Sequence, residues 1–407
     1  MAESQPAQWH DARRLAYDAG SPLPLEQVAL ADAVGRVLAD DMTALIDVPH
    51  YASSAMDGWA VSGDPPWSLI KAGPLRAGEA TRIVTGGLVP DGARAVLRSE
   101  SGEETYSAGS MLVAPTASAS PDEPRDGMHI RPVGEEAHAG ERVCRAGVTL
   151  NPAHIAVAAV CGHDELSVAP RPRVSLIFTG DEVVTSGIPA PGHVRDSFGP
   201  QLHSLIGMLG AHTSSQQRLP DRLDRFVATL EPKPDGVMRP DVIVTTGGTG
   251  HSPADHLHDA LDAVRARVLI DGIVMRPGGP TLLARLQDGS FVVGLPGNPL
   301  AAMMGVFTVL QPLLAALRGV PVPTLGRVAV GHDLAGGRGR IRLIPYLIED
   351  GVAVTSAWHG SGMLRGLADA HGVLLCPASG ASAGDQVQTL PLPWITTVTD
   401  NEMGHTQ

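Results

Sequence analysis

The sequence predicts a multidomain α/β protein in which one parallel-sheet domain is joined to β-rich domains. Three observations support this fold class. The chain has 407 residues, which is too long for a single hydrophobic core. Strand-like and helix-like segments alternate between residues 169 and 320, as they do around a parallel sheet. Elsewhere the 47 glycines and 34 prolines favour turns and short strands over long helices.

The N-terminal domain is predicted to be helical and to consist of two separated segments, residues 1–46 and 149–168. The first segment carries helical patterning from residue 8 to residue 46, broken by Ser21, Pro22 and Pro24 and then by Gly35. In the second segment, Asn151 is a suitable helix cap, Pro152 fits the first helical position, and Gly162 is expected to end the helix. The two segments are predicted to form one linker domain.

Two further domains are predicted to be rich in strands. Residues 47–148 contain short apolar runs bounded by glycine and proline, such as Thr81–Val84, and predict a small β-rich domain. Residues 321–393 lack helical periodicity and predict a compact all-β domain. The last segment, residues 394–407, is polar and is expected to be disordered.

The domain between residues 169 and 320 is predicted to hold the main sheet. Four of its segments read as buried strands: Val174–Phe178, Val242–Val244, Thr281–Leu286 and Phe291–Leu295. Apolar residues at helical spacing indicate two helices, through Leu202, Leu205, Ile206 and Leu209 and through Leu257, Leu261, Val264 and Val268. A last helix begins at Asn298 and Pro299 and is expected to kink at Pro312. This alternation predicts a mostly parallel sheet with helices on both faces.

The segment Asp241–Asp255, which reads DVIVTTGGTGHSPAD, is the strongest candidate for a ligand-binding loop. A strand ends in Thr245, Thr246, Gly247 and Gly248, and Ser252 and Pro253 are expected to start a helix. Free amides at a helix N-terminus bind anions, and Asp255 in the first turn could meet a magnesium ion held by phosphate. The alternative is a tight turn in which Asp255 only complements the helix dipole.

Two more loops are expected at the same edge of the sheet. They contain Thr179, Gly180, Asp181 and Glu182, and Pro296, Gly297 and Asn298. One such loop alone is better explained as a turn, but three on one sheet favour a phosphorylated ligand held by backbone amides. Arg276, Pro277 and Gly278 add a cation beside this edge, unless they form only a turn with an exposed arginine.

The composition excludes several classes of partner. A formal charge of −13 and an aromatic content of 3% argue against nucleic acid and against an anionic membrane. The three cysteines are far apart in the sequence, which fits a reducing compartment. His251, His256 and His258 lack the spacing of a zinc site and are expected to be solvated. The N-terminus has no signal-peptide core and no run reaches transmembrane length, so a cytoplasmic protein is expected.

Five motifs stand in an order and spacing that resemble one protein family. They are SAMDGWA at Ser54–Ala60, RIVTGGLVPDGARAV at Arg82–Val96, TGDE at Thr179–Glu182, TTGG at Thr245–Gly248 and GLPGNP at Gly294–Pro299. This order is similar to that of the molybdopterin molybdenumtransferase family, which includes MoeA and the E domain of gephyrin. GSGMLRGLADAHG at Gly360–Gly372 is similar to the family's final domain. The resemblance covers nearly the whole chain.

The resemblance implies four domains, among them a molybdopterin-binding α/β domain and a C-terminal β-barrel. It implies a homodimer with each site in a cleft between protomers. The implied reaction inserts molybdate into adenylylated molybdopterin and releases AMP with the help of magnesium. Molybdopterin adenylyltransferase and proteins of molybdoenzyme maturation are the implied protein partners, and neither nucleic acid nor a membrane is expected.

The family's functional residues can be carried over to matching positions. Asp57 and Asp255 match acids implicated at the molybdate or metal site, and Glu136 stands where the family usually has aspartate. The candidate catalytic residues are therefore Asp57, Asp255 and Glu136, with Asp57 and Asp255 as metal ligands. The candidate substrate-binding residues are Thr179, Gly180, Asp181, Glu182, Asp196, Ser197, Thr246, Gly247, Gly248, Thr249, Arg276, Pro277, Gly278, Pro296, Gly297 and Asn298.

The chain departs from the family pattern at three places. The family's KPGKP is RPGGP here, with Arg276 and Gly279 in place of its lysines. The usual asparagine after Asp196 and Ser197 is Phe198, and the serine of the common GGVS form is Gly250. TTGGTG is more similar to the related molybdopterin adenylyltransferases. An adenylyltransferase-like enzyme and a non-catalytic molybdopterin-binding relative are therefore the alternatives.

Overall fold

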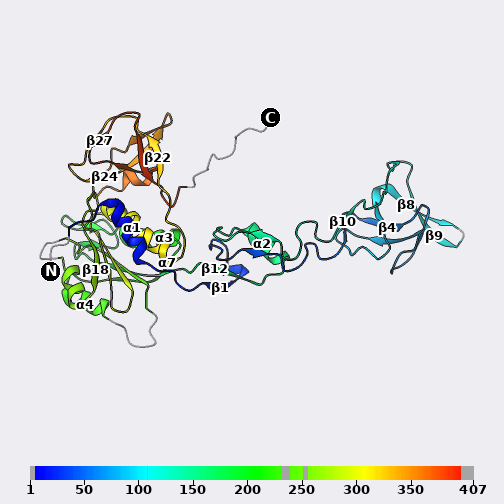
Figure 1. Ribbon diagram of the computed structural model, residues 1–407, viewed down its shortest axis with the longest axis horizontal. Helices are drawn as coiled ribbons and strands as arrows, with labels where there is room; N and C mark the ends of the chain where they lie inside the picture. The colour runs from blue at the N-terminus through cyan, green and yellow to red at the C-terminus, as the bar shows by residue number, and fades with distance from the viewer. Residues whose placement is uncertain (1–4, 108, 232–238, 251–254, 396–407) are drawn as a thin grey trace. The chain divides into compact units, whose positions relative to one another are not determined.

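A computed structural model of the chain describes residues 5–107, 109–231, 239–250 and 255–395 (Figure 1). The chain divides into two compact units. Unit 1 combines Met1–Pro24 with Pro170–Gln407, and unit 2 is Leu25–Ala169. The predicted α/β domain and the C-terminal all-β domain both belong to unit 1, and the chain leaves unit 1 after its first helix to form unit 2.

Unit 1 is built on a six-stranded sheet with the order β16-β13-β17-β21-β20-β18 (Figure 1). The first four strands are parallel, and β20 and β18 are antiparallel to their neighbours. The strands are β13 (Arg173–Phe178), β16 (His212–Arg218), β17 (Val242–Thr246), β18 (Arg267–Asp271), β20 (Leu282–Arg285) and β21 (Phe291–Leu295). The mostly parallel sheet is confirmed, whereas β16 and β18 were not predicted.

Helices cover both faces of this sheet because side chains of its strands alternate between two hydrophobic cores. Leu176 and Val244 belong to one core, together with α3 (Phe198–Met208). Ile177 and Ile243 belong to the other core, with α4 (Leu223–Leu230) and α5 (Leu257–Ala263). Strands buried on both faces have the continuous apolar runs that the sequence shows.

The last helical segment of the α/β domain is continuous but irregular. It consists of α6 (Pro299–Gly305), the π-helical turn η3 (Val306–Leu310) and α7 (Gln311–Leu317). Pro312, the predicted cause of a kink, follows the π-helical turn directly, and such a turn accommodates a residue that lacks an N–H. The expectation that no run reaches transmembrane length is wrong for these 19 residues, but the 18-residue apolar window within them is entirely buried, as in a core helix.

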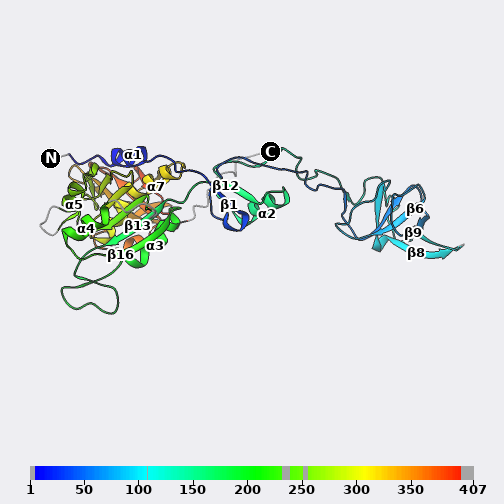
Figure 2. The ribbon, with the colours of Figure 1, turned by 90° about the horizontal axis from the view of Figure 1, so that it is seen from below.

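The N-terminal helix α1 (Trp9–Ala19) packs along this segment (Figure 2). Trp9 Nε1 donates a hydrogen bond of 2.9 Å to Thr308 Oγ1. The guanidinium of Arg13 donates to the carbonyl oxygens of Phe307 and Pro323. Burial lowers the pKa of Arg13 to about 10. Residues at the beginning of the chain therefore belong to the same core as residues near its end.

Residues 20 to 46 are not helical, contrary to the prediction. They form β1 (Glu26–Ala29), the short turn η1 (Leu30–Asp32) and β2 (Met42–Thr43). β1 pairs with β12 (Glu165–Val168), and β2 pairs with β11 (Arg142–Cys144). Pairing with strands more than a hundred residues away overrides the local pattern.

The helix after the Asp241–Asp255 loop also differs from the prediction. It begins at Leu257, so Asp255 precedes the first turn. Val268 lies in β18, because the helix ends before Val264. The predicted cap residues Ser252 and Pro253, like His251, lie outside the described residues.

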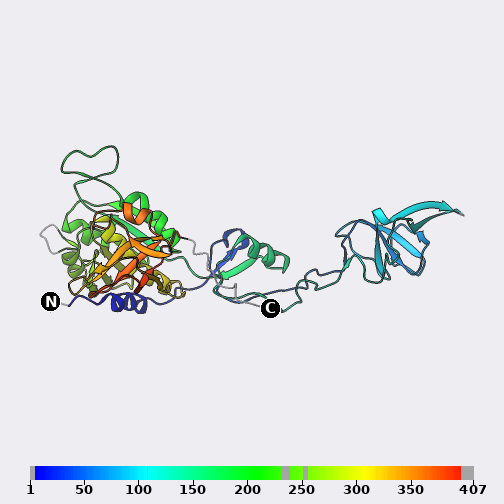
Figure 3. The ribbon, with the colours of Figure 1, turned by 90° about the horizontal axis from the view of Figure 1, so that it is seen from above.

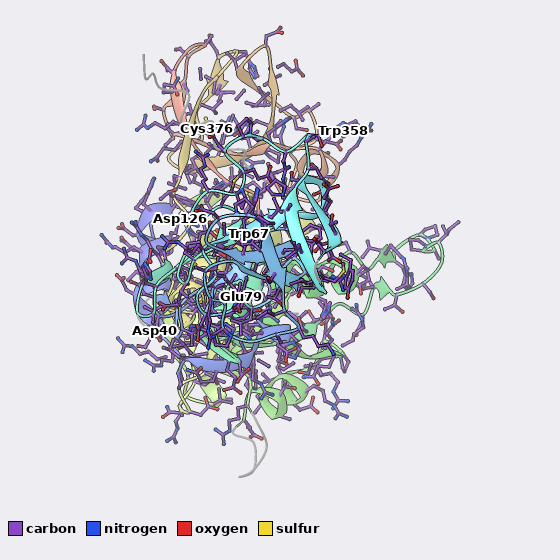
Figure 4. The ribbon with its side chains drawn as sticks, turned by 90° about the vertical axis from the view of Figure 1, so that its right-hand side faces the viewer. Asp40, Trp67, Glu79, Asp126, Trp358 and Cys376 are labelled. Atoms are coloured by element: carbon purple, nitrogen blue, oxygen red, sulfur yellow. The ribbon has the colours of Figure 1, made fainter. Side chains whose placement is uncertain are left out.

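Unit 2 is rich in strands, as predicted. Its largest sheet has the order β7-β4-β6-β5-β9-β8, and Trp67, labelled in Figure 4, is a buried residue of its strand β5. The strands and turns are β3 (Ser53–Ser54), β4 (Gly58–Ser62), β5 (Trp67–Leu69), β6 (Glu79–Ile83), β7 (Ala95–Arg98), η2 (Ser99–Ser101), β8 (Gly102–Ser107), β9 (Ser110–Pro115) and β10 (Ile130–Arg131). The predicted helix is α2 (Pro152–Val160), which Asn151 caps by accepting from the backbone N–H of His154.

The C-terminal part of unit 1 is a second sheet, with the order β19-β24-β26-β28-β22 and β25 beside β24 (Figure 3). One bridge, Val330 to Ala353, joins its β22 end to β25. The elements are β19 (Met275–Arg276), β22 (Gly326–Ala329), β23 (Leu334–Ala335), β24 (Ile341–Glu349), β25 (Val352–Thr355), α8 (Arg365–Ala368), β26 (Gly372–Cys376), β27 (Gly380–Ala381) and β28 (Gln386–Leu390). The short helix α8 was not predicted. Trp394, placed in the disordered tail by the sequence, packs near Phe307, while residues 396–407 lie outside the described residues.

Candidate functional site

Three loops meet at the carboxyl ends of β13, β17 and β21. These strands are adjacent and parallel, and Phe178, Thr246 and Leu295 lie side by side at their ends. Together with the start of α3, the loops enclose a cavity of about 770 Å³, which we call the loop cavity. Its lining is Thr179, Gly180, Glu182, Val183, Val194, Arg195, Asp196, Ser197, Phe198, Asp221, Thr246, Gly247, Gly248, Thr249, Gly250, Asp255, Pro280, Pro296, Gly297, Asn298, Pro299 and Gly362. The predicted meeting of three loops is present.

The turn after β17 is shaped for close approach by a ligand. Gly247 and Gly248 have φ values of 84° and 68°, which residues with a Cβ rarely adopt. A Cβ on Gly247 would lie 2.7 Å from Thr179 Oγ1, whose hydroxyl donates to the Thr246 carbonyl. Within the described part of the chain, the buried hydroxyl of Thr246 has no hydrogen-bond partner. A buried polar atom without a partner in a cavity wall indicates that a ligand completes it.

Two of the predicted carboxylates have structural partners. Asp196 accepts from the backbone N–H groups of Phe198 and Gly199 and forms an ion pair of 2.7 Å with Arg218, so it caps the start of α3. Asp181 is not among the described residues that line the cavity, and its carboxylate accepts from the backbone N–H of Asp221 at 3.4 Å. Asp221 itself lines the cavity and accepts from the backbone N–H of Gly180. Asp221 follows β16, the polar strand that the sequence did not predict, so no local signal pointed to it.

Asp255 lines the loop cavity beside Gly250. A Cβ at Gly250 would lie 2.6 Å from Asp255 Oδ2, which is closer than real Cβ atoms come to other atoms. The glycine that replaces the family's serine therefore makes room for the carboxylate. Asp255 lines the cavity from the loop before α5.

The predicted cation Arg276 lines a second and larger cavity of about 1070 Å³. We call it the arginine cavity because Arg276 and three further arginines, Arg338, Arg340 and Arg342, line it. The other lining residues are Met275, Pro277, Gly278, Gly279, Pro280, Pro296, Asn298, Ala301, Gly336, Gly337, Leu343, Ile344, Ala357, His359, Gly360, Ser361 and Met363. Arg276, Pro277 and Gly278 thus belong to this cavity and not to the loop cavity. Three arginines come from GGRGRIR at residues 336–342, a charge signal that the sequence offered and that the predictions did not use.

The two cavities are neighbours with opposite charge. They share Pro280, Pro296 and Asn298 as wall residues. The arginine cavity has no Asp or Glu in its lining, and within the described residues its four arginines form no ion pair with a carboxylate. The loop cavity has four carboxylates, from Glu182, Asp196, Asp221 and Asp255, and one arginine, Arg195. A doubly charged oxyanion fits the first cavity, and a ligand bound through amides or with a cation fits the second.

Comparison with known proteins identifies the family. The N-terminal region of MoeA (domains I and II) matches residues 7–162, and a probable molybdopterin-binding domain matches residues 175–316. The molybdopterin molybdenumtransferase of Staphylococcus aureus is 28% identical over 400 residues, which cover 91% of this chain and 92% of that protein. The chain belongs to the MoeA family.

Other relatives agree with this assignment. The molybdopterin molybdenumtransferase of Staphylococcus epidermidis is 27% identical over 393 residues, covering 89% of this chain and 90% of its own length. A crystal structure of the MoeA protein from Pyrococcus horikosii has a TM-score of 0.73 at 24% identity and covers 95% of this chain and 98% of its own. That likeness shows a shared MoeA fold.

Asp57, the acid of the MoeA motif SAMDGWA, belongs to unit 2. Its Oδ1 accepts from the backbone N–H of Thr85 at 2.6 Å and from the Thr85 hydroxyl at 2.9 Å. These bonds lower the pKa of the Asp57 carboxyl below its usual range, so the group stays ionised. A Cβ on Gly58 would lie 2.0 Å from the carbonyl oxygen of Leu97, which explains the glycine that follows. Glu136 also belongs to unit 2, where it is exposed.

The residues of the loop cavity fit a magnesium ion that is shared with a phosphorylated ligand. Among the described residues, no group of three or more His, Cys, Asp or Glu side chains could hold a metal ion. Magnesium in phosphate sites needs only one or two carboxylates, because phosphate oxygens and water complete its shell. Asp255 and Glu182 supply such carboxylates in the cavity wall.

His258, expected to be solvated, instead contacts Asp271 at 2.9 Å.

Proposed function

We propose that this chain is a molybdopterin molybdenumtransferase, which inserts molybdate into adenylylated molybdopterin and releases AMP. Its relatives in two staphylococci bear that name. The observation that carries the proposal is the pair of adjoining cavities, one lined by glycine loops and carboxylates and the other by four arginines. A reaction between an oxyanion and a phosphorylated substrate requires both kinds of site side by side.

The loop cavity binds the adenylylated molybdopterin in this proposal. The turn at Gly247 and Gly248 brings backbone close to the phosphate, and the hydroxyl of Thr246 gains the partner that it lacks. Thr179, Gly180, Ser197, Thr249, Gly297 and Asn298 supply the remaining contacts predicted from the sequence. Asp196 acts by holding the start of α3 and not by direct contact.

The arginine cavity binds molybdate. Four guanidinium groups neutralise its two negative charges inside a protein of net charge −13. Asp255 and Glu182 would hold magnesium together with the substrate phosphate. Asp57 is proposed as a further metal-binding residue, and Glu136 as a further catalytic residue. Magnesium, when bound, supplies positive charge to the phosphate of the departing AMP.

The test is an incubation of the purified protein with adenylylated molybdopterin, magnesium and molybdate, in which AMP release is followed over time. Release that depends on molybdate is expected. A requirement for ATP with molybdopterin as substrate would instead indicate the adenylyltransferase-like alternative. Binding of adenylylated molybdopterin without AMP release would indicate the non-catalytic relative.

Substitution of Gly279 by lysine is expected to tighten molybdate binding. Gly279 lines the arginine cavity at the position where the family has lysine, and its φ is not in the left-handed region. A Cβ there would be 3.4 Å from the nearest atom, the Met275 carbonyl oxygen, so a side chain fits. An added charged hydrogen bond of about 1.5–3 kcal/mol should lower the KM for molybdate at least several-fold.

The neighbouring glycine provides the control. Gly278 has a φ of 103°, and a Cβ on it would lie 2.6 Å from Met275 Cε. Gly278→Ala is therefore expected to lower the thermal unfolding midpoint and to raise the KM for molybdate. If Gly279→Lys behaves like Gly278→Ala, the space seen at residue 279 does not admit a side chain and the role of the lost lysine is misjudged.

We also propose that the protein is a homodimer, as the family resemblance implies, and that it works in the cytoplasm. Its three cysteines are buried free thiols, as expected in a reducing compartment. Sedimentation velocity at micromolar concentration should give the mass of two chains. A single species of 42.3 kDa would contradict the dimer.

A further inference from the structure

Among the described residues that line the loop cavity, Phe198 is the one aromatic residue. Aromatic residues make up only 3% of the chain, so a ring at this place is unexpected on composition alone. The other lining residues are glycines, prolines, small polar residues, two valines and charged side chains.

Phe198 is held at the start of α3 through its backbone. Its backbone N–H donates to Asp196 Oδ1 at 3.0 Å, and Asp196 forms an ion pair of 2.7 Å with Arg218. Phe198 is partly buried and packs against the main hydrophobic core. The same residue lines the loop cavity.

An aromatic side chain does not form strong hydrogen bonds with a phosphate or a sugar. The backbone amides of the glycine loops and the hydroxyl groups of the cavity can bind those groups. The aromatic side chain suits a planar ring, because the faces of aromatic rings attract other π systems in offset-stacked or edge-on arrangements. The proposed substrate carries two planar nitrogen heterocycles, a purine and a pterin. Stacking on a side chain contributes to binding of such rings without hydrogen-bond readout.

We propose that Phe198 is a substrate-specificity residue that stacks against a planar nitrogen heterocycle of the ligand in the loop cavity. This inference rests on the proposed function, which supplies the heterocycle. Phe198 selects for ring-containing ligands over ring-free phosphates, and the Asp196–Arg218 pair holds the backbone of Phe198 at the start of α3. The purine and the pterin share this chemistry, and binding measurements distinguish between them.

Calorimetric titration of the full-length protein with AMP, neopterin and ribose phosphate tests the assignment. Phe198→Leu keeps an apolar group on the core but removes the ring, and Phe198→Tyr keeps the ring. The Kd for AMP or for neopterin should rise about ten-fold in Phe198→Leu, and the ligand that responds identifies the stacked ring. Phe198→Tyr should bind like the wild type, and the Kd for ribose phosphate should not change in either variant.

Two further measurements separate stacking from a purely structural role. The KM for adenylylated molybdopterin should rise in Phe198→Leu while kcat is retained, and Met208→Ala, on the same helix but outside the loop cavity, should change neither. Equal weakening of all three ligands in Phe198→Leu, or no weakening of any, overturns the inference. So does a wild-type protein that binds AMP and neopterin no more tightly than ribose phosphate. Failure of the proposed function shows separately, as absence of molybdate-dependent AMP release by the wild type.

Discussion

Asp255→Asn is expected to slow AMP release by a factor of about 100 or more, as when an electrostatic stabiliser worth about 2.7–4 kcal/mol is removed. Asp255 lines the loop cavity next to Gly250, where a phosphate is expected. Asparagine keeps the shape and one acceptor oxygen but loses the charge that would hold magnesium on that phosphate. Adenylylated molybdopterin should then accumulate on the protein.

The fold should survive this substitution. Asp255 precedes the helix start, and the lost interaction of its charge with the helix dipole is expected to change the free energy of unfolding by about 0.3–1 kcal/mol. Quenched-flow measurement of AMP at several magnesium concentrations gives the rate. Asp259→Asn makes the same charge change at an exposed position of α5 outside both cavities and should leave the rate unaltered. A wild-type rate and magnesium dependence in Asp255→Asn would reduce Asp255 to a loop residue of no catalytic consequence.

Arg276→Ala is expected to raise the KM for molybdate with a smaller effect on kcat. A hydrogen bond to a charged group contributes about 1.5–3 kcal/mol, which corresponds to a ten-fold to hundred-fold weakening. Arg276 belongs to the cavity with three other arginines, so binding is weakened but not abolished.

The matched control for Arg276→Ala is Arg285→Ala. Arg285 is exposed on β20 outside both cavities, and its guanidinium lies over the ring of Phe291 at 5.4 Å. AMP release is measured at varied molybdate and, separately, at varied adenylylated molybdopterin. A rise only in the KM for adenylylated molybdopterin would indicate that Arg276 binds that substrate and not molybdate. No change in either KM would indicate that Arg276 binds neither substrate.

The core of the α/β domain could be predicted because its signals are local. β13, β17 and β21 are β-branched runs that end in glycine loops, and such runs identify buried parallel strands without knowledge of the fold. Their adjacency, and so the meeting of three loops, follows from the parallel sheet. Thr246, Asp255 and Asn298 lie in or after these loops, and all three line the loop cavity.

The elements that were missed depend on contacts between distant residues. β16 reads HTSSQQR and has no apolar pattern, yet it pairs with β13. Asp221 follows β16 in the sequence and lines the loop cavity. Residues 20–46 kept a helical pattern but pair with strands beyond residue 140. The arginine cavity combines a loop near residue 276 with a run near residue 340. The spacing of apolar residues in the sequence does not show that these two segments lie together.

The packing of α1 has a consequence for synthesis on the ribosome. Trp9 emerges first, but its partner Thr308 lies 299 residues later, and unit 2 is complete in sequence long before. At about 5–20 residues per second, this delay is roughly 15–60 s. During that time unit 2 can fold as a contiguous segment, whereas Trp9, Ala12 and Ala16 lack the core that buries them. The nascent chain therefore carries an amphipathic helix whose apolar face stays uncovered until translation passes residue 317.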